Sequence, residues 1–390
     1  MKIGIVLSQP PGYSETFFNS KIEGLQKNGF EVTLFCQNNG VGFNTCKVKR
    51  FSKTTSNPII QLLYFFKVYM VLLPYIKKVM NWYSLESKHG VSKLKFLKKV
   101  YINAPILKAD LDWLHFGFGT LALERETLAK AIVAKMAVSF RGFDIGIYPL
   151  KNPNCYQKLW KHLDKLHVIS EDIHSLAAKQ GLPETIPVTK ITPAIDLEFF
   201  NTEKTENLST MPICKMITVG RLHWKKGYEE ALLALKIVKY AGYQFQYKII
   251  GEGDEYERIA YAAYELGLKD EVLFLGKLSR EEVKKNVEEA TVYLQYSIQE
   301  GFCNSVLEAQ ALGKLCIVSN AEGLSENVLN NKSGWVVPKL QHEQLAQKII
   351  EVIEMPAEQK KNITSFAKRR IIEEFNIKKQ QQEFVEFYKN

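Results

Sequence analysis

The sequence predicts an α/β protein made of two doubly wound, Rossmann-like domains with parallel sheets. Short apolar runs rich in β-branched and aromatic residues alternate with helical patterns along the chain. A polar segment at 201–210 divides this alternation into two series and is predicted to be a linker. The length of 390 residues suits two domains, which commonly hold about 100–200 residues each.

The first series defines a predicted domain at 1–200. Its strands are expected at 2–8, 31–36, 112–116, 137–140, 165–170 and 186–191, with helices that include 15–27 and 172–180. Strands that alternate with helices in this way run parallel and are covered on both faces.

The second series defines a predicted domain at 211–376. Its strands are expected at 214–220, 246–251, 271–276, 291–296, 315–320 and 334–338, and its helices at 227–241, 254–267, 280–289, 304–312 and 341–354. A last helical segment, 377–390, is expected to pack back on the first domain. Two such domains on one linker should face each other across a cleft at the carboxyl ends of their strands, where open α/β sheets bind ligands.

Composition excludes several classes of protein. The apolar fraction of 46% and the charged fraction of 24% are ordinary for a soluble globular chain. Six cysteines without a C-x-x-C pair fit neither a zinc site nor a disulfide framework, and the seven histidines lack metal-ligand spacing. The N-terminus MKIGIVLSQPPG is predicted to be a first strand rather than a signal peptide. We therefore expect a reduced, cytoplasmic protein.

The net charge of +10 is concentrated in one segment. Residues 47–99 hold 12 basic residues and one acidic residue, Glu86. This segment contains the apolar run 58–83, which Gln61, Lys67 and Pro74 interrupt, so a membrane span is disfavoured. Two interpretations stay open: a basic amphipathic helix at an anionic lipid surface, or a buried helix with a solvated lysine edge. Nucleic acid is not expected, because no recognition motif accompanies the charge.

Two strand-exit loops of the second domain carry candidate ligand-binding residues. In VGRLHWKKG, Arg221 and Lys226 flank the start of a helix, an arrangement that can hold a phosphate. In IIGEGDEYERI, Gly251 and Gly253 permit close backbone approach. A nucleotide pocket and an ordinary strand-to-helix turn both fit the second loop, which is not a G-x-G-x-x-G fingerprint.

The stretch QEGFCNSVLEAQ at 299–310 places two glutamates eight residues apart. Glu300 lies on a strand-exit loop, where it can point into the cleft. Glu308 lies in a helix, and Ser305 and Glu308 also form an S-x-x-E capping-box pattern, so Glu308 is either a ligand or a helix cap. The amides of residues 302–305 at the helix start are a second potential anion site.

In the second domain, the ordered combination of VGRL…KKG, IIGEG and E-G-F-x-N-x-x-x-E resembles the retaining glycosyltransferases of family 4 (glycosyl transferases group 1), which have the two-domain GT-B fold. The resemblance implies that Arg221 and Lys226 hold the donor diphosphate, that Glu300 binds the donor sugar and that Glu308 binds the ribose. It places Leu278 near the nucleotide base. The other donor-binding residues it implies are Gly251, Gly253, Gly301, Phe302, Asn304 and Ser305.

The first domain is similar to exopolysaccharide and colanic-acid-type members of that family. PPGYSETFF at 10–18 looks like their P-x-x-S-E-T-F segment and makes Ser14 and Glu15 acceptor-side candidates. WLHFGFGT keeps one histidine of their H-x-H-F-G stretch, His115. SFRGFDIG occupies the H-G-x-D position, with Asp144 retained and Arg141 in place of histidine. Arginine is always protonated, so Arg141 can stabilise negative charge but cannot act as a general base.

The resemblance implies a hexosyltransferase that moves sugar from a nucleoside-diphosphate donor to a glycan or polyprenyl-linked acceptor with retention, in capsule, exopolysaccharide or lipopolysaccharide biosynthesis. It implies no cofactor and no metal: Asp110 and Asp112 imitate a D-x-D motif but precede a predicted strand. Basic residues in 47–99 suggest a peripheral position at the inner face of the cell membrane. The alternatives are a sugar-nucleotide epimerase of the same fold and a catalytically silent scaffold. Donor, acceptor, linkage and oligomeric state do not follow from the sequence.

Overall fold

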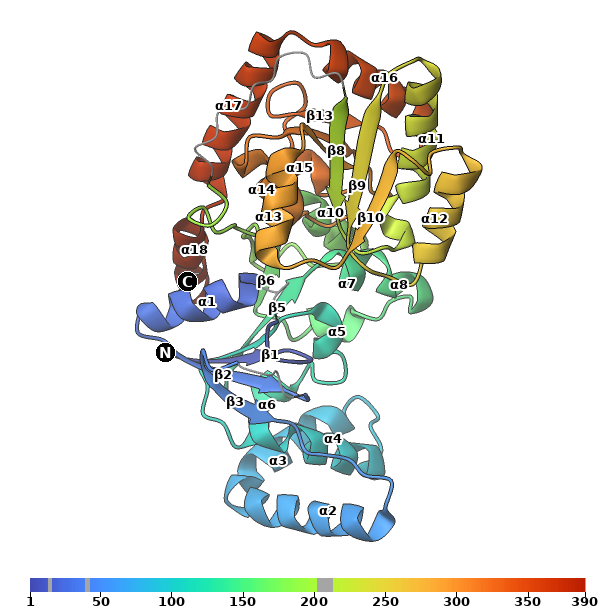
Figure 1. Cartoon of the computed structure of the whole chain (residues 1–390). Coiled ribbons are helices and arrows are strands. Elements are labelled where there is room, and N and C mark those ends of the chain that lie inside the picture. The colour runs from blue at the N-terminus through green and yellow to red at the C-terminus, as the bar shows by residue number, and fades with distance from the viewer. Residues whose placement is uncertain (13–15, 39–42, 202–212, 390) are drawn as a thin grey trace. The chain divides into compact units, whose positions relative to one another are not determined.

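The computed structural model describes residues 1–12, 16–38, 43–201 and 213–389 (Figure 1). The acceptor-side candidates Ser14 and Glu15 and most of the predicted linker lie outside these residues. The chain forms two compact units, Met1–Thr192 with Gln380–Asn390, and Pro193–Lys379. Their division falls between Thr192 and Pro193, ahead of the predicted linker.

The first unit contains a seven-stranded parallel sheet in the order β3-β2-β1-β4-β5-β6-β7. Its strands are β1 (Lys2–Val6), β2 (Glu31–Cys36), β3 (Lys47–Arg50), β4 (Trp113–Phe116), β5 (Lys135–Phe140), β6 (Lys165–Val168) and β7 (Val188–Lys190). The chain starts at β1, builds outward to β3 and then crosses to β4 on the other side of β1. The strand order therefore reverses between β1 and β4, where such sheets bind ligands.

The helices of the first unit fall into two groups. Between β3 and β4 the chain forms α2 (Pro58–Leu72), the 3₁₀ turn η2 (Leu73–Tyr75), α3 (Ile76–Ser87) and α4 (Lys93–Leu107). The remaining helices are α1 (Thr16–Lys27), α5 (Gly119–Ala122), α6 (Leu128–Ala131), α7 (Gly142–Gly146), α8 (Tyr148–Lys151), α9 (Gln157–Trp160), α10 (Glu171–Lys179) and α18 (Ile377–Lys389).

The C-terminal helix α18 completes the core of the first unit. Phe384, Phe387 and Tyr388 belong to the same buried cluster as Ile3 on β1 and Phe17 on α1. The close approach of α1 and α18 requires a residue without a side chain at Gly24, because a Cβ there would lie 2.4 Å from Cγ of Gln381.

The second unit contains a six-stranded parallel sheet in the order β10-β9-β8-β11-β12-β13. Its strands are β8 (Cys214–Val219), β9 (Phe245–Ile250), β10 (Val272–Gly276), β11 (Val292–Gln295), β12 (Leu315–Ser319) and β13 (Trp335–Val337). Its helices are η3 (Trp224–Lys226), α11 (Tyr228–Tyr240), α12 (Tyr256–Glu265), α13 (Arg280–Glu289), α14 (Asn304–Ala311), α15 (Leu324–Asn327), α16 (His342–Glu354) and α17 (Ala357–Glu374). The predicted fold class, two Rossmann-like parallel-sheet units, is confirmed.

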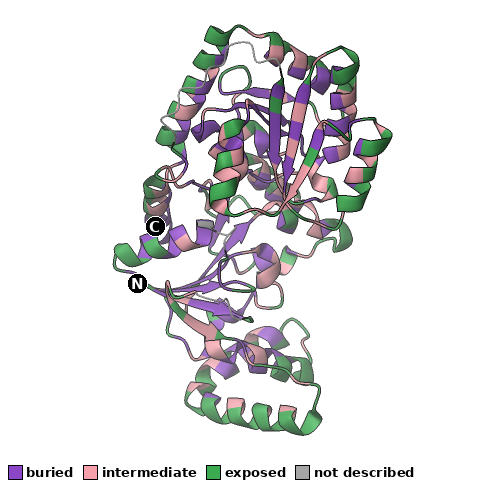
Figure 2. Cartoon of the chain, viewed as in Figure 1, coloured by how far each residue is buried: buried purple, intermediate pink, exposed green. Residues whose placement is uncertain are grey.

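One of the two interpretations of the apolar run at 58–83 is wrong. Helix α2 is not buried: Leu72 is its only buried residue, and Figure 2 shows the rest of the helix exposed or partly exposed. By length and composition, Pro58–Ser87 is the one helical segment among the described residues apolar enough to cross a membrane, and only 6% of its most apolar window is buried. Pro74 interrupts it at η2.

A buried ion-pair cluster fixes α3 to α4 and to the body of the first unit. Glu86 has no exposed surface and bonds Lys99, Thr127 and Lys158, the last at 2.9 Å. Burial alone would raise the pKa of Glu86, but hydrogen bonds from the two lysines and from Thr127 lower it to about 2. The indole of Trp82 donates to the same Thr127 hydroxyl at 3.0 Å. The cluster therefore joins α3 to α4, to α9 and to the start of α6 through one carboxylate.

Replacing that carboxylate should destabilise the first unit. We expect Glu86→Ala to lower the free energy of unfolding by about 3–5 kcal/mol, because it leaves the ammonium of Lys99 buried and unpaired. The matched control is Glu124→Ala, which removes the exposed partner of Lys95 and should change stability by about 0.5 kcal/mol or less. Urea unfolding followed by circular dichroism measures both; equal effects would contradict the structural role of Glu86.

Candidate functional site

The sheet of the second unit opens at the carboxyl ends of its two central strands. Strands β8 and β11 pair only at Met216 with Val292 and at Ile217 with Tyr293. Beyond this point side chains replace the backbone ladder: Thr218 donates its hydroxyl to the carbonyl of Leu294. The amide of Val219 donates to the Tyr293 hydroxyl at 3.1 Å. The strand order reverses between these two strands, so the opening lies at the switch point of the sheet.

The loops that leave β8 and β11 meet across this opening. The amide of Ile298 donates to the carbonyl of Lys225 at 2.7 Å. Gly227 has φ +64°, and a Cβ on it would lie 2.1 Å from the carbonyl oxygen of Tyr296. Glycine is therefore required both by the backbone conformation and by the close contact of the two loops.

The contact brings Lys226 and Glu300 together as an ion pair. Nζ of Lys226 donates to Oε2 of Glu300, and the two side chains are 18% and 17% exposed. Burial, which favours the neutral amine, is outweighed by the carboxylate of Glu300, so the pKa of Lys226 is raised. The ammonium of Lys226 thus stays charged in a largely desolvated site.

A second layer of residues holds Glu300 in place. The backbone amide of Glu300 donates to Oε2 of Glu322 at 2.7 Å, and the carbonyl of Glu300 accepts from the amide of Gly323 at 3.0 Å. Lys339 donates to the carbonyl of Ile298 at 3.0 Å and lies 3.4 Å from Oε1 of Glu322. The loops after β12 and β13 therefore support the loop after β11.

Gly251 and Gly253 pack against backbone of the neighbouring loop. A Cβ on Gly251 would lie 2.0 Å from the carbonyl oxygen of Gly220, and one on Gly253 would lie 2.1 Å from that of Leu222. The amide of Leu222 also donates to the carbonyl of Glu252 at 2.9 Å. The two glycines thus place the loop after β9 directly on the loop that carries Arg221.

Glu308 does not cap α14. The helix begins at Asn304 with Cys303 as N-cap and has no side-chain cap hydrogen bond. Ser305 lies inside the helix and donates its hydroxyl to the carbonyl of Val219 at 3.2 Å. The capping-box interpretation is therefore wrong, because the helix starts two residues earlier than that pattern requires. Burial raises the pKa of Glu308 to about 7, against a lowering by the charge of Arg280.

The remaining donor-side candidates lie at or near the carboxyl ends of strands of the same sheet. Arg221 is exposed and close enough to Lys226 to lower its pKa, against the larger effect of Glu300. Leu278 is half-buried in the loop between β10 and α13, and Asn304 is half-buried at the first position of α14. Gly301 is buried and lies against Gly323. A Cβ on Gly323 would lie 2.0 Å from the carbonyl oxygen of Gly301.

Two observations reduce the number of groups at the start of α14 that are available to bind an anion. Phe302 is buried and its ring lies 5.9 Å from that of Phe375, so its side chain belongs to the packing against the end of α17. The amide of Cys303 donates to Oδ1 of Asn327 at 3.0 Å. That amide is already engaged within the protein, which reduces the set of donors that an anion would meet.

His115 of the first unit lies within a buried polar cluster. Its Nε2 is 2.7 Å from the Ser139 hydroxyl and its Nδ1 is 2.6 Å from the Tyr388 hydroxyl. Ser139 in turn lies 2.7 Å from Nδ1 of His167, and Nζ of Lys21 lies 3.2 Å from Nδ1 of His115. Burial, and then the charge of Lys21, hold the pKa of His115 well below its usual range. The imidazole has no exposed surface, so it does not reach a ligand directly.

Arg141 and Asp144 follow strand β5 of the same unit. The guanidinium of Arg141 lies 4.5 Å from the ring centre of Phe17 and 4.8 Å from that of Phe18, in cation–π geometry. Asp144 is buried and accepts hydrogen bonds from the amide of Thr120 at 3.1 Å and from that of Arg141 at 3.3 Å. Burial raises its pKa to about 6 against these hydrogen bonds. Asp144 therefore orders the loops that carry Arg141.

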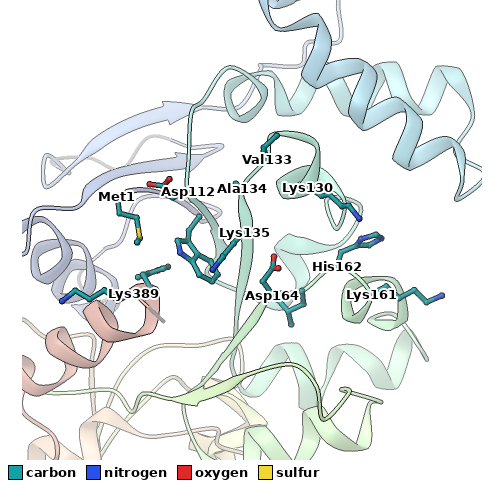
Figure 3. A pocket seen from close by; sticks show the side chains of 13 residues that line it. Met1, Asp112, Lys130, Val133, Ala134, Lys135, Lys161, His162, Asp164 and Lys389 are labelled. Atoms are coloured by element: carbon teal, nitrogen blue, oxygen red, sulfur yellow. The ribbon is translucent and has the colours of Figure 1, made fainter.

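A hollow of about 770 Å³ lies at the opposite, amino ends of strands β4 to β6 (Figure 3). Its carboxylates serve the fold: Asp112 accepts from the amide of Lys2 at 2.6 Å, and Asp164 accepts from the amide of Met136 at 2.7 Å. Asp110 likewise pairs with the Lys2 ammonium at 2.8 Å. The D-x-D pattern thus joins the starts of two strands.

Sequence reasoning missed two charged residues of the second-unit site. Glu322 follows β12 in SNAEG, at the carboxyl end of a strand next to β11, and that position was its only available signal. Arg280 is the first residue of α13, directly after the N-cap Ser279 and inside the S-x-x-E capping box; its guanidinium lies 3.2 Å from Asp196 and 3.9 Å from the ring centre of Phe199. The positive charge of Arg280 lowers the pKa of Glu308, against the larger rise caused by burial.

Comparison with known proteins identifies relatives along the whole chain. The family described as "Glycosyl transferases group 1" matches residues 202–370. The amylovoran biosynthesis glycosyltransferase AmsK of Erwinia amylovora is 30% identical, over 69% of this chain and 68% of that protein. The putative colanic acid biosynthesis glycosyltransferase WcaL of Escherichia coli is 27% identical, over 96% of each chain.

Solved structures are similar in fold. A glycosyltransferase from Rickettsia africae superimposes with a TM-score of 0.70 at 17% identity, over 100% of this chain and 97% of that one. Anabaena HepE, solved in complex with UDP and glucose, superimposes with a TM-score of 0.73 at 15% identity, over 99% and 98% of the two chains.

Because folding raises the pKa of Glu308, the free energy of unfolding should depend on pH. Folding raises this pKa from an ordinary value of 4.5 to about 7, so the folded state binds the proton more tightly. The stabilisation is fully present below about pH 4.5 and is lost as the pH rises through about 7. We expect Glu308→Gln to gain stability relative to wild type as the pH rises from 5 to 8, by up to about 3 kcal/mol.

Urea unfolding of both proteins at each pH measures this difference. The matched control is Glu373→Gln, which removes an exposed carboxylate on α17. A stability difference between wild type and Glu308→Gln that does not change with pH would contradict a raised pKa at this site.

Proposed function

We propose that this chain, which belongs to the glycosyl transferases group 1 family, transfers a hexose from a nucleoside-diphosphate sugar with retention of configuration. The acceptor is a glycan or a lipid-linked sugar. That the chain is a glycosyltransferase follows from its family. The donor class, the stereochemistry and the acceptor are proposals.

The observation that carries the proposal is the Lys226–Glu300 pair at the open switch point of the second sheet. A diphosphate needs cations and a sugar needs hydrogen-bond acceptors for its hydroxyl groups. Lys226, with Arg221 nearby, supplies positive charge, and Glu300 supplies acceptor oxygens within the same opening. A donor that enters can exchange the internal ion pair for a phosphate on Lys226 and a hydroxyl on Glu300.

In the proposed reaction, the bond from the anomeric carbon to the diphosphate oxygen breaks, and its electron pair leaves with the diphosphate. The acceptor hydroxyl forms the new bond on the same face, and its proton passes to the departing phosphate oxygen. Positive charge preorganised around that oxygen stabilises the transition state by about 3–4 kcal/mol for each good donor. Lys226 is in this position because Glu300 orients it before the donor arrives.

Other residues have supporting roles in this proposal. Glu308 binds the ribose hydroxyls, and Leu278 contacts the base. Arg141, whose backbone amide donates to Asp144, stabilises negative charge on the acceptor side, while His115 is a positioning residue because it is buried. We propose that the cations of the site hold the diphosphate without a metal ion. Among the described residues, no cluster of three or more His, Cys, Asp or Glu is arranged as metal ligands.

The relatives suggest the biological setting. AmsK and WcaL are described as glycosyltransferases of amylovoran and colanic acid biosynthesis, two exopolysaccharides. We propose that this chain likewise acts in surface-polysaccharide assembly, on the cytoplasmic side of the membrane, where an acceptor linked to a lipid would be presented.

Removing the Lys226 ammonium should abolish most turnover. We expect Lys226→Ala to lower kcat by about 10²–10³-fold, because one preorganised donor to the leaving group is lost. The matched control is Lys215→Ala, an exposed lysine near the start of β8, which should keep full activity. Release of nucleoside diphosphate measures turnover and circular dichroism verifies folding; a folded, fully active Lys226→Ala protein would refute the proposed role.

A donor panel separates the proposed transferase from its alternatives. UDP-, GDP- and ADP-sugars are incubated with the protein, with and without lipid-linked acceptors. A transferase releases nucleoside diphosphate and joins the sugar to the acceptor, and the anomeric configuration of the product tests retention. An epimerase would change the sugar while it stays attached to the nucleotide, and a scaffold would do neither.

A further inference from the structure

Helix α2 of the first unit exposes large apolar side chains along one face. Ile59 and Leu62 are each 71% exposed, Phe66 is 67% and Leu63 is 62% exposed. With 3.6 residues per turn, positions 59, 62, 63, 66, 70 and 73 lie on one face. Exposed side chains at 70 and 73, Met70 and Leu73, continue that face. The helix therefore presents an unbroken apolar stripe from its first turn to η2.

A neighbouring face of α2, roughly 100° around the helix from the stripe, is the one that contacts the protein. The ring of Phe65 stacks on that of Tyr101 of α4 at 4.2 Å, and the hydroxyl of Tyr69 donates to the carbonyl of Leu97 at 2.7 Å. Leu72 is buried. Surface helices of soluble proteins normally turn a polar face outward. In α2 both faces are apolar, and the exposed one, green in Figure 2, lacks a partner within the described residues.

The surroundings of this stripe are basic. Lys67 lies on its flank, and Lys93 and Lys98 are exposed on α4 beside the exposed apolar residues Leu94 and Leu97. The only acidic residue of 47–99, Glu86, is buried in its cluster with Lys99. Consequently no carboxylate from this segment faces outward. Apolar side chains bordered by lysines match an anionic lipid surface in both charge and polarity.

The geometry favours a helix that lies on a bilayer over one that crosses it. The 15 residues of α2 span about 22 Å at 1.5 Å per residue, less than the hydrocarbon thickness of about 30 Å. Asn57 caps the helix at one end, and Pro74 in η2 breaks it at the other. The contacts of Phe65 and Tyr69 with α4 keep one face on the protein.

We propose that the exposed apolar face of α2, with the basic residues that flank it, docks the first unit on an anionic phospholipid bilayer. The helix lies parallel to the surface with Leu63 and Phe66 among the acyl chains, while Lys67 and Lys98 contact lipid phosphates. This function of the surface is separate from the donor chemistry of the second unit and does not rest on it.

Vesicle flotation tests the proposal with two variants. Wild type should float with vesicles of phosphatidylcholine and phosphatidylglycerol at low salt, and much less with phosphatidylcholine alone. Leu63→Gln with Phe66→Gln should lower the partition coefficient at least about tenfold, because two acyl-chain contacts are lost. Lys67→Glu with Lys98→Glu should also lower it at least about tenfold, since each basic residue near an anionic leaflet contributes about fivefold.

Matched controls carry comparable substitutions on exposed sites of the second unit. Tyr261→Gln with Tyr264→Gln alters α12, and Lys269→Glu with Lys361→Glu makes the same change in net charge. These proteins should float like wild type. Because all substituted residues are exposed, circular dichroism should show every variant folded.

Three outcomes would overturn the proposal. Wild type that ignores anionic vesicles at low salt has no such docking surface. α2 variants that bind as well as wild type place the contact elsewhere. A dimer in light scattering that Leu63→Gln with Phe66→Gln converts to monomer assigns the face to a second copy of the chain. Nucleoside-diphosphate release from a soluble donor should be equal in wild type and α2 variants, which separates a failure here from a failure of the proposed transferase activity.

Discussion

The site of the second unit depends on the early separation of β8 from β11. Two paired positions join these strands; after them, the hydroxyls of Thr218 and Tyr293 satisfy backbone groups that a continuing ladder would have paired. The buried polar groups therefore remain bonded while the sheet opens, which avoids the free-energy cost of unsatisfied amides. Gly227 then lets one loop lie against the other.

This opening explains why a charged pair is stable there and why it suits a ligand. Lys226 and Glu300 are each less than one-fifth exposed, and either alone would carry a desolvation penalty. As a pair, the two side chains lie in a site with little exposure to solvent. A ligand that offers only an anion would leave Glu300 unpaired, and one that offers only hydroxyls would leave Lys226 unpaired. The donor we propose, a sugar diphosphate, offers both groups, so in that proposal the pair selects for ligands that carry both.

The sequence predicted those parts of the molecule that depend on local pattern. Apolar runs identified twelve of the strands, but β3, with sequence KVKR, was missed because an edge strand facing solvent needs no apolar alternation. The strand-exit glycines and Lys226 were found from their order along the chain. Glu322 was missed because its role is a contact between loops after β11 and β12. Of the two alternatives for Glu308, the helix cap failed because α14 starts at Asn304. Burial of His115 depends on Tyr388, 273 residues away, which no local pattern reports.

In the helices between β3 and β4, the residues that stabilise the fold differ from those that form the exposed apolar stripe. Glu86 and Trp82 join α3 to the unit from within, while Phe65 and Tyr69 attach α2 through α4. The residues of the outward stripe contribute little to folding, because side chains that remain more than half exposed bury little apolar area. In water alone, such a stripe raises the tendency to aggregate without stabilising the fold. The docking on an anionic bilayer that we propose would account for both this apolar character and the lysines around the stripe.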